Sequence, residues 1–459
     1  MPRPSRRQLL TAFAVAAVGP LAACTGTPSP GPSSPTSPTP SPSGLPFGLV
    51  TPSRVEAVVF DGAFGVGYVE AAAAAMSANH PGVTVRVRPV QDIIAVVEPR
   101  LAEGGTPPDL VDNSGARLLP VAKLADQFAE LDDLMDSASL DGGVLRDTLQ
   151  HDVLATGTFN DRLIALNYAL SVFGLWHSAA DFAAAGWEVP RTWDRMFELG
   201  AAAKEQGRFL FAWGDEAADY YQELAIASAV KEGGHEVRIA LDSLAEGAWS
   251  HPAVTGVLEQ LEAIVAAGFV LHGGDYLTAQ ASWLKDRAAL LYPAGSWLPT
   301  EMSEQIPADY ALSVAPVPTL TAAPVLPHAA VHATPTEQFL VPRRASNVAG
   351  AFELLRTMLT REAATEFSRE HLVPTIVRES VPADVTDTAL TSQARLLADA
   401  GANVFSWRFV AHYGLSGESN VAWADFLSGQ ITASVLAARL QTLANRVRND
   451  PAVERYAVE

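Results

Sequence analysis

Short apolar strands alternate with helices in the body of the chain. Residues 55–60 read as an apolar strand, residues 68–79 as an alanine-rich helix, and residues 83–87 as a second strand. Residues 93–103 and 109–112 repeat the pattern with a helix and a strand. Strand–helix–strand alternation predicts parallel strands covered by helices. We therefore expect an α/β fold, in which ligands bind beyond the carboxyl ends of the strands.

The first 24 residues have the three parts of a bacterial export signal. Arg3, Arg6 and Arg7 are positively charged, and residues 9–18 form an apolar run too short to span a bilayer. A Leu-Ala-Ala sequence then precedes Cys24, which resembles the lipobox of bacterial lipoproteins. We expect lipidation of Cys24, which would anchor an exported protein to the outer face of the cell membrane. A chance cysteine in an ordinary signal peptide is the alternative, and the paired arginines leave the export route, Sec or twin-arginine, open.

Composition disfavours several classes of protein. The 459 residues include 31 Lys and Arg against 51 Asp and Glu, a formal charge of −20, whereas nucleic-acid binding needs a basic surface. Cys24 is the only cysteine, so an intrachain disulfide and a cysteine-based zinc site are both impossible.

Residues 25–47 begin with a stretch rich in Pro, Ser and Thr, which predicts an extended tether between the anchor and the folded body.

Four short motifs follow one another along the first half of the chain. They read HPGVTVRV from His80, GGTPPDLV from Gly104, DRLIALNY from Asp161 and AGWEVPRTWD from Ala185. In this order they resemble the large extracellular solute-binding proteins of carbohydrate ABC importers. Three later segments, AWSHPAV, AQASWLKDRAALLYPAGSWLPTEM and VAPVP, are most similar to the subgroup that binds N-acetylglucosamine and chitobiose.

The resemblance implies two α/β lobes, each built from discontinuous segments and joined by a hinge. Hinge segments are expected near residues 164–168, 312–318 and 373–376. The predicted domains are a signal peptide at 1–24, a tether at 25–47, lobe I at 48–164 and 317–374, and lobe II at 165–316 and 375–459. Such a protein captures a sugar between its lobes, closes over it and docks on membrane permease subunits, without cofactor, metal or catalysis. We expect a monomer.

The predicted ligand explains which residue types the site needs. A sugar has apolar C–H faces and a ring of hydroxyl groups, so it needs aromatic platforms and planar hydrogen-bonding groups. The resemblance implies that Trp297 and Trp407 stack on the sugar, and Trp213 follows another predicted strand. Core packing is the alternative for each aromatic candidate, and a solvated loop position is the alternative for each acid. The other candidate ligand-binding residues are Asp61, Phe64, Asp112, Asn113, Tyr168, Asp215, Tyr220 and Glu337.

Two other classes of function stay open. A secreted hydrolase or lyase is the first, because hydrolysis of a glycosidic bond needs two carboxylates whose spacing in the sequence is not fixed. A structural or adhesive surface lipoprotein is the second. The sequence lacks Gly-x-Ser-x-Gly, His-Glu-x-x-His and EF-hand patterns. Gly65 and Gly67 resemble the start of a dinucleotide fingerprint, but Glu70 stands where the next glycine belongs, which disfavours nucleotide binding.

Overall fold

The computed structural model describes residues 45–62, 64–102, 104–114, 118–159, 161–453, 455–456 and 458. The predicted signal peptide, Cys24 and the tether up to residue 44 lie outside the described residues. The chain from Ser43 onward forms one compact unit. None of the helices in its described part is long and apolar enough to cross a membrane.

Lobe I is built on a sheet with the strand order β13-β12-β3-β1-β2, and β6 joins it beside β12. Strands β1, β2 and β3 are parallel, whereas β12 runs antiparallel to β3 and β6. Successive side chains of a strand point to opposite faces, so Val55, Ala57 and Val59 share a core with α1, and Val58 packs with α2. The strands are β1 (Ser53–Phe60), β2 (Val83–Val90), β3 (Leu110–Asp112), β6 (Ala165–Val172), β12 (Val331–Leu340) and β13 (Val404–Phe405).

Helices cover both faces of this sheet. The alanine-rich α1 ends at Asn79, because Pro81 disfavours helical backbone at His80. It packs against α12, which comes from much later in the chain. A short hairpin of β4 (Thr158–Phe159) and β5 (Arg162–Leu163) precedes β6. The helices are α1 (Gly67–Asn79), α2 (Ile93–Leu101), α3 (Val121–Leu124), α4 (Asp132–Met135), α12 (Val348–Met358) and α13 (Arg361–His371).

Lobe II is built on a second sheet with the order β11-β7-β10-β8-β9. Strand β8 runs parallel to β10 and β9, and β7 is antiparallel to β10 and β11. The strands are β7 (Gly174–Ser178), β8 (Phe209–Trp213), β9 (Val270–His272), β10 (Ala289–Ala294) and β11 (Leu312–Ala315). The helices are α5 (Ala179–Ala185), α6 (Trp193–Glu205), α7 (Tyr220–Gly233), α8 (His235–Asp242), α9 (Pro252–Ala266), α10 (Tyr276–Leu284), α11 (Leu298–Glu301), α14 (Thr388–Ala400), α15 (Phe409–His412), α16 (Ser416–Leu427) and α17 (Ala433–Asn449).

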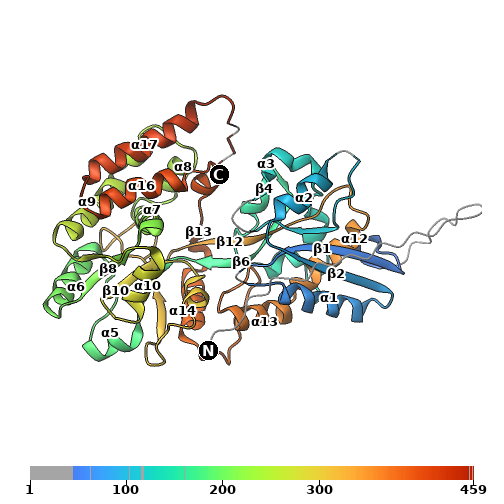
Figure 1. Ribbon diagram of the computed structural model, residues 1–459, viewed down its shortest axis with the longest axis horizontal. Coiled ribbons are helices and arrows are strands. Elements are labelled where there is room, and N and C mark those ends of the chain that lie inside the picture. The colour runs from blue at the N-terminus through green and yellow to red at the C-terminus, as the bar shows by residue number, and fades with distance from the viewer. Residues whose placement is uncertain are drawn as a thin grey trace, which may run out of the picture. The chain divides into compact units, whose positions relative to one another are not determined.

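Strands β6 and β12 run side by side between the two lobes (Figure 1). They pair antiparallel from Ala165 opposite Leu340 to Val172 opposite Ala333. Residues 374–376 also lie against β6, because Leu170 N–H donates to Pro374 O at 2.9 Å and Ile376 N–H donates to Tyr168 O at 3.0 Å. The prediction of an α/β fold with two discontinuous lobes is confirmed.

One predicted hinge segment lies elsewhere. Residues 312–318 were expected to cross between the lobes, and this prediction is wrong, because β11 forms the edge of the second sheet against β7. The crossing strand is β12. The segment between them also stays with lobe II, since Thr319 N–H donates to Arg191 O at 3.0 Å and Leu326 N–H donates to Lys231 O at 2.9 Å. Residues 317–326, placed in lobe I by the sequence, therefore contact the helices of lobe II.

Candidate functional site

A cavity of about 530 Å³ lies where the two lobes face each other. Phe64, in the loop after β1, lines it from lobe I. All the other lining residues come from lobe II, and they follow strands β8 and β10 or begin helices. They are Glu216, Ala217, Tyr220, Tyr276, Trp297, Thr300 and Glu301. We call this space the Trp297 cavity. It brings together three of the predicted ligand-binding residues, Phe64, Tyr220 and Trp297.

The Trp297 ring is held by the turn that follows β10. It folds back over Gly295, where an added Cβ would lie 2.1 Å from the indole ring. Only glycine permits this approach. Ser296 ties the same turn to the crossing strand, because Val172 N–H donates to Ser296 Oγ at 2.7 Å. The small residues of this turn therefore fix the orientation of a large aromatic ring.

Two further aromatic rings meet Trp297 edge-on. The ring of Phe173 has its centroid 5.3 Å from that of Trp297, and the ring of Tyr220 has its centroid 5.6 Å away. Burial raises the pKa of the Tyr220 phenol well above its ordinary value, so this hydroxyl keeps its proton and can donate a hydrogen bond. The cavity wall thus offers aromatic surface with one polar tip.

Two carboxylates that the sequence analysis missed also line the Trp297 cavity. Glu216 accepts a hydrogen bond from Tyr276 N–H at 3.1 Å, and Glu301 accepts one from Gln280 Nε2 at 2.9 Å. These bonds hold both acids in place. Glu301 could have been found from the sequence, because residues four apart on a helix share a face and it lies four positions after Trp297. Glu216 could also have been found, because it directly follows Asp215, which was predicted.

A second polar cluster lies in lobe I at the ends of β1 and β3. Asp112 is fully buried, and it accepts hydrogen bonds from the Ser114 hydroxyl and, at 3.3 Å, from Phe60 N–H. Burial and then the nearby Glu337 carboxylate raise the pKa of Asp112 well above its ordinary value. Glu337 has φ +57°, a conformation that costs energy for residues other than glycine. Asn113 is buried and bonds to the neighbouring backbone, accepting from Leu119 N–H at 2.7 Å.

Three of the predicted residues that do not line the Trp297 cavity also lie outside this polar cluster and outside the larger cavity described below. Tyr168 is only 1% exposed; its ring stacks on Tyr68 and its hydroxyl donates to Met358 O at 3.1 Å. Trp407 is also buried, and one face of its indole stacks on His332 with centroids 3.6 Å apart. Asp61 is exposed just after β1. Ligand contact by these three residues stays a prediction.

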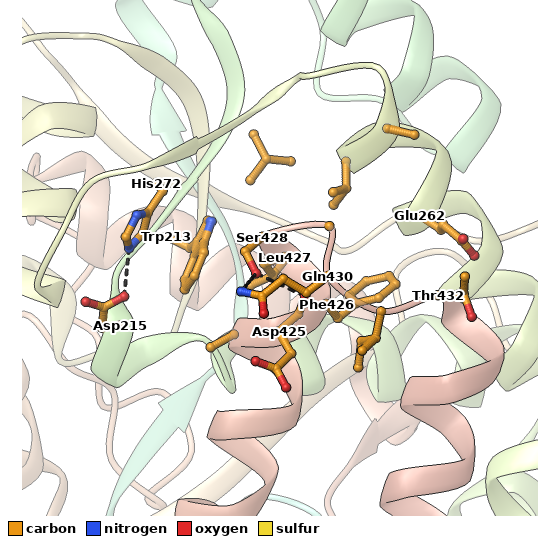
Figure 2. A pocket seen from close by; sticks show the side chains of 16 residues that line it. Trp213, Asp215, Glu262, His272, Asp425, Phe426, Leu427, Ser428, Gln430 and Thr432 are labelled. Atoms are coloured by element: carbon orange, nitrogen blue, oxygen red, sulfur yellow. Dashed lines mark hydrogen bonds and ion pairs between the residues drawn. The ribbon is translucent and has the colours of Figure 1, made fainter.

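A larger cavity, of about 770 Å³, lies within lobe II and contains the predicted residues Trp213 and Asp215 (Figure 2). It is bounded by the ends of β8 and β9, the last turn of α9, and the turn between α16 and α17. The His272 ring lies tilted against that of Trp213 with centroids 4.4 Å apart, and its Nε2 is hydrogen-bonded to Asp215 Oδ1 at 2.7 Å. We call this space the Trp213 cavity. Across the described residues, no three His, Cys, Asp or Glu side chains gather as metal ligands.

Comparison with known proteins places the chain in a family. The family described as "Bacterial extracellular solute-binding protein" matches residues 65–365. Diacetylchitobiose binding protein NgcE of Streptomyces coelicolor is 43% identical over 463 residues, which cover 99% of this chain and 98% of that protein. This match is long and close enough to show common family membership.

Solved structures show the same fold at low identity. A chitin oligosaccharide binding protein matches with a TM-score of 0.64 and 16% identity, covering 87% of this chain and 99% of that one. A probable secreted solute-binding lipoprotein from Streptomyces coelicolor matches with a TM-score of 0.70 and 17% identity, covering 86% and 98%. With the two-lobed fold, the interlobe cavity and the near full-length relative, the chain belongs to the bacterial extracellular solute-binding protein family.

Proposed function

We propose that the protein binds a chito-oligosaccharide in the Trp297 cavity and delivers it to the permease of an ABC importer. The single observation that carries the proposal is the composition of this cavity, in which Trp297, Tyr220 and Phe64 surround a space that also holds Glu216 and Glu301. Aromatic rings match the C–H faces of a pyranose, and carboxylates form strong hydrogen bonds with hydroxyl groups. The 43% identity to a diacetylchitobiose binding protein supports this choice of sugar.

Capture is proposed to occur by closure of the lobes. Phe64 contributes from lobe I and Trp297 from lobe II, so a sugar in the cavity contacts both lobes at once. A ligand that interacts with both lobes favours the closed arrangement by the difference between its affinities for the two states. Bending of the paired strands β6 and β12 would allow the movement. The closed form then docks on the permease.

The protein is proposed to work beside the membrane as a monomer. A lipid on Cys24 and the tether that follows it would hold the folded body at the outer face of the cell membrane. The sugar is then captured in water and passed to permease subunits in the same membrane. In this reading the chain itself performs no chemistry and needs no cofactor.

Five of the other predicted ligand-binding residues are proposed to act around the main cavity. Trp213 and Asp215 line the neighbouring Trp213 cavity. The lobe I cluster supplies Asp112, Asn113 and Glu337, which we propose bind the sugar from the side opposite Trp297. These roles rest on the position of the cluster at the carboxyl ends of parallel strands, where ligands of α/β sheets bind.

Calorimetric titration with diacetylchitobiose tests the proposal. Cellobiose is the matched control, because it has the same linkage and lacks the acetamido groups. We expect saturable binding of diacetylchitobiose, weaker binding of cellobiose, and recovery of the sugar unchanged after long incubation. At 100 times the dissociation constant the ligand adds about 2.7 kcal/mol to stability, which a thermal melt detects. No binding would contradict the proposal, and release of N-acetylglucosamine would favour the hydrolase instead.

A further inference from the structure

We infer that the Trp213 cavity is a second saccharide-binding site, which takes the sugar units of a longer chito-oligosaccharide that extend beyond the Trp297 cavity. The inference rests on the proposed function and adds to it a preference for chain length. Nothing in the comparisons assigns this cavity. With about 770 Å³ it is larger than the Trp297 cavity and within the size range of small-molecule sites.

The two cavities share one short piece of backbone. Asp215 lines the Trp213 cavity, whereas the next two residues, Glu216 and Ala217, line the Trp297 cavity. These three residues form a single turn of 3-10 helix directly after β8. The turn is fixed on one side by Asn420, whose Nδ2 donates to Asp215 O at 2.7 Å. The two cavities therefore adjoin the same turn, and an oligosaccharide that extended past it from the first cavity would reach the second.

The aromatic floor of the Trp213 cavity suits a sugar ring. Trp213 is only 3% exposed, and the imidazole of His272 lies over it with an interplanar angle of 30°. Asp215 holds that imidazole in place through the 2.7 Å hydrogen bond. His272 keeps about half of its side chain exposed, so its outer face is a platform backed by an indole. A pyranose can pack its C–H face on this platform.

An unpartnered donor also points to a ligand. The indole Nε1 of Trp213 is buried and has no hydrogen-bond partner among the described residues. The indole that carries this nitrogen lines the cavity (Figure 2). Buried donors in folded proteins nearly always have a partner, so a bound group that supplied one here would be stabilised by it. A sugar hydroxyl or an acetamido oxygen would accept this hydrogen bond.

The opposite wall supplies acceptors and restricts the class of sugar. Asp425 is bound by Arg439 through one oxygen, at 2.6 Å, and Glu262 accepts from Ala433 N–H at 2.9 Å. The side chain of Gln430 is exposed on the turn between α16 and α17. With Asp215, three carboxylates surround the space. Carboxylates accept hydrogen bonds from hydroxyl and acetamido N–H groups and repel anionic sugars, so the cavity suits neutral amino-sugar oligomers.

Chain-length dependence of binding tests the inference. Calorimetric titrations of the full chain would use N-acetylated chito-oligosaccharides of two and of five units as probes. We expect the longer sugar to bind about tenfold more tightly, the gain from one stacking contact and one or two added hydrogen bonds. Ser428→Trp places a bulky ring at the exposed edge of the cavity and should abolish this gain, with little change for the two-unit sugar. Ser434→Trp is the matched control, since Ser434 is exposed on α17 and does not line the cavity.

The possible results separate the two proposals. A length gain that survives in both Ser428→Trp and His272→Ala would overturn the second site. Equal affinities of the two sugars for the unmodified chain would also overturn it and leave the Trp297 cavity untouched. If neither sugar binds, the proposed function itself fails. Loss of the gain in His272→Ala supports the site even where Ser428→Trp folds poorly, because His272 is exposed and its removal leaves the core intact.

Discussion

Replacing Trp297 by alanine distinguishes between two possible roles of this residue, a platform for the ligand and a part of the core. The indole is half-buried and makes two edge-on contacts, with Phe173 and Tyr220. Each such pair contributes about 0.5–1.5 kcal/mol beyond its buried area. Trp297→Ala should therefore lose these two pair contributions and only part of the burial that a core tryptophan has, so its cost should fall at the lower end of the range of about 3–5 kcal/mol typical of a fully buried tryptophan. Loss of the platform should weaken sugar binding by about 2 kcal/mol, which is about thirtyfold.

A denaturant melt and a calorimetric titration on the same variant measure both quantities. Trp187→Ala is the matched control, because Trp187 is also half-buried, meets Phe182 edge-on at 5.9 Å and lies outside both cavities. The control should lose some stability and keep its affinity for diacetylchitobiose. Unchanged affinity of Trp297→Ala together with a collapsed melting midpoint would refute the reasoning, since the ring would then serve packing alone.

Three further predictions concern the anchor, acidity and metals. Cys24→Ala should release the protein from the membrane fraction, and persistent acyl labelling of that variant would show that the lipid is attached elsewhere. The folded chain raises the pKa of Asp112, so its proton is held where the unfolded chain has lost it; this contribution to stability is present at low pH and is lost as pH rises. Melts at about pH 5 and about pH 8 should therefore show a smaller change for Asp112→Asn than for the unmodified chain, and equal changes would rule the effect out. Dialysis against a chelator should leave sugar affinity unchanged, whereas a loss that one added metal restores would reveal a metal site.

Local pattern was enough to predict the first strands and helices of lobe I. The strand at 55–60 and the helix at 68–79 appear as β1 and α1, because apolar runs and alanine-rich segments bounded by glycine and proline depend on nearby residues alone. Strand β12 was missed. Its centre reads Thr-Pro-Thr-Glu-Gln, which lacks the apolar alternation of a strand, and Pro335 cannot donate to the ladder. Pairing with β6, distant in the sequence, makes this segment a strand.

For the candidate site too, the positions set by nearby residues could be predicted, and those set by distant segments could not. Phe64 and Trp297 could be predicted because each lies in a loop that follows a strand, whereas Tyr220 was a candidate only for its phenol and begins α7. The surroundings of Trp407 could not, because His332 reaches it only through the pairing of β13 with β12. Tyr168 likewise lies beneath Tyr68, a neighbour that no spacing along the chain indicates. Contacts between distant segments decide which aromatic side chains are covered.

The discontinuous lobes determine when this protein can fold. Strand β3 pairs early with β1 but receives its second partner only when Phe339 and Leu340 of β12 have appeared, and α9 is covered by α17, which ends at Asn449. Proteins built from consecutive domains can fold one domain at a time as the chain emerges from the ribosome or translocon. Here lobe I is not complete until β12, α12 and α13 are released, and lobe II is not complete until α17 is released. A truncation before β12 therefore leaves two incomplete cores rather than one finished half.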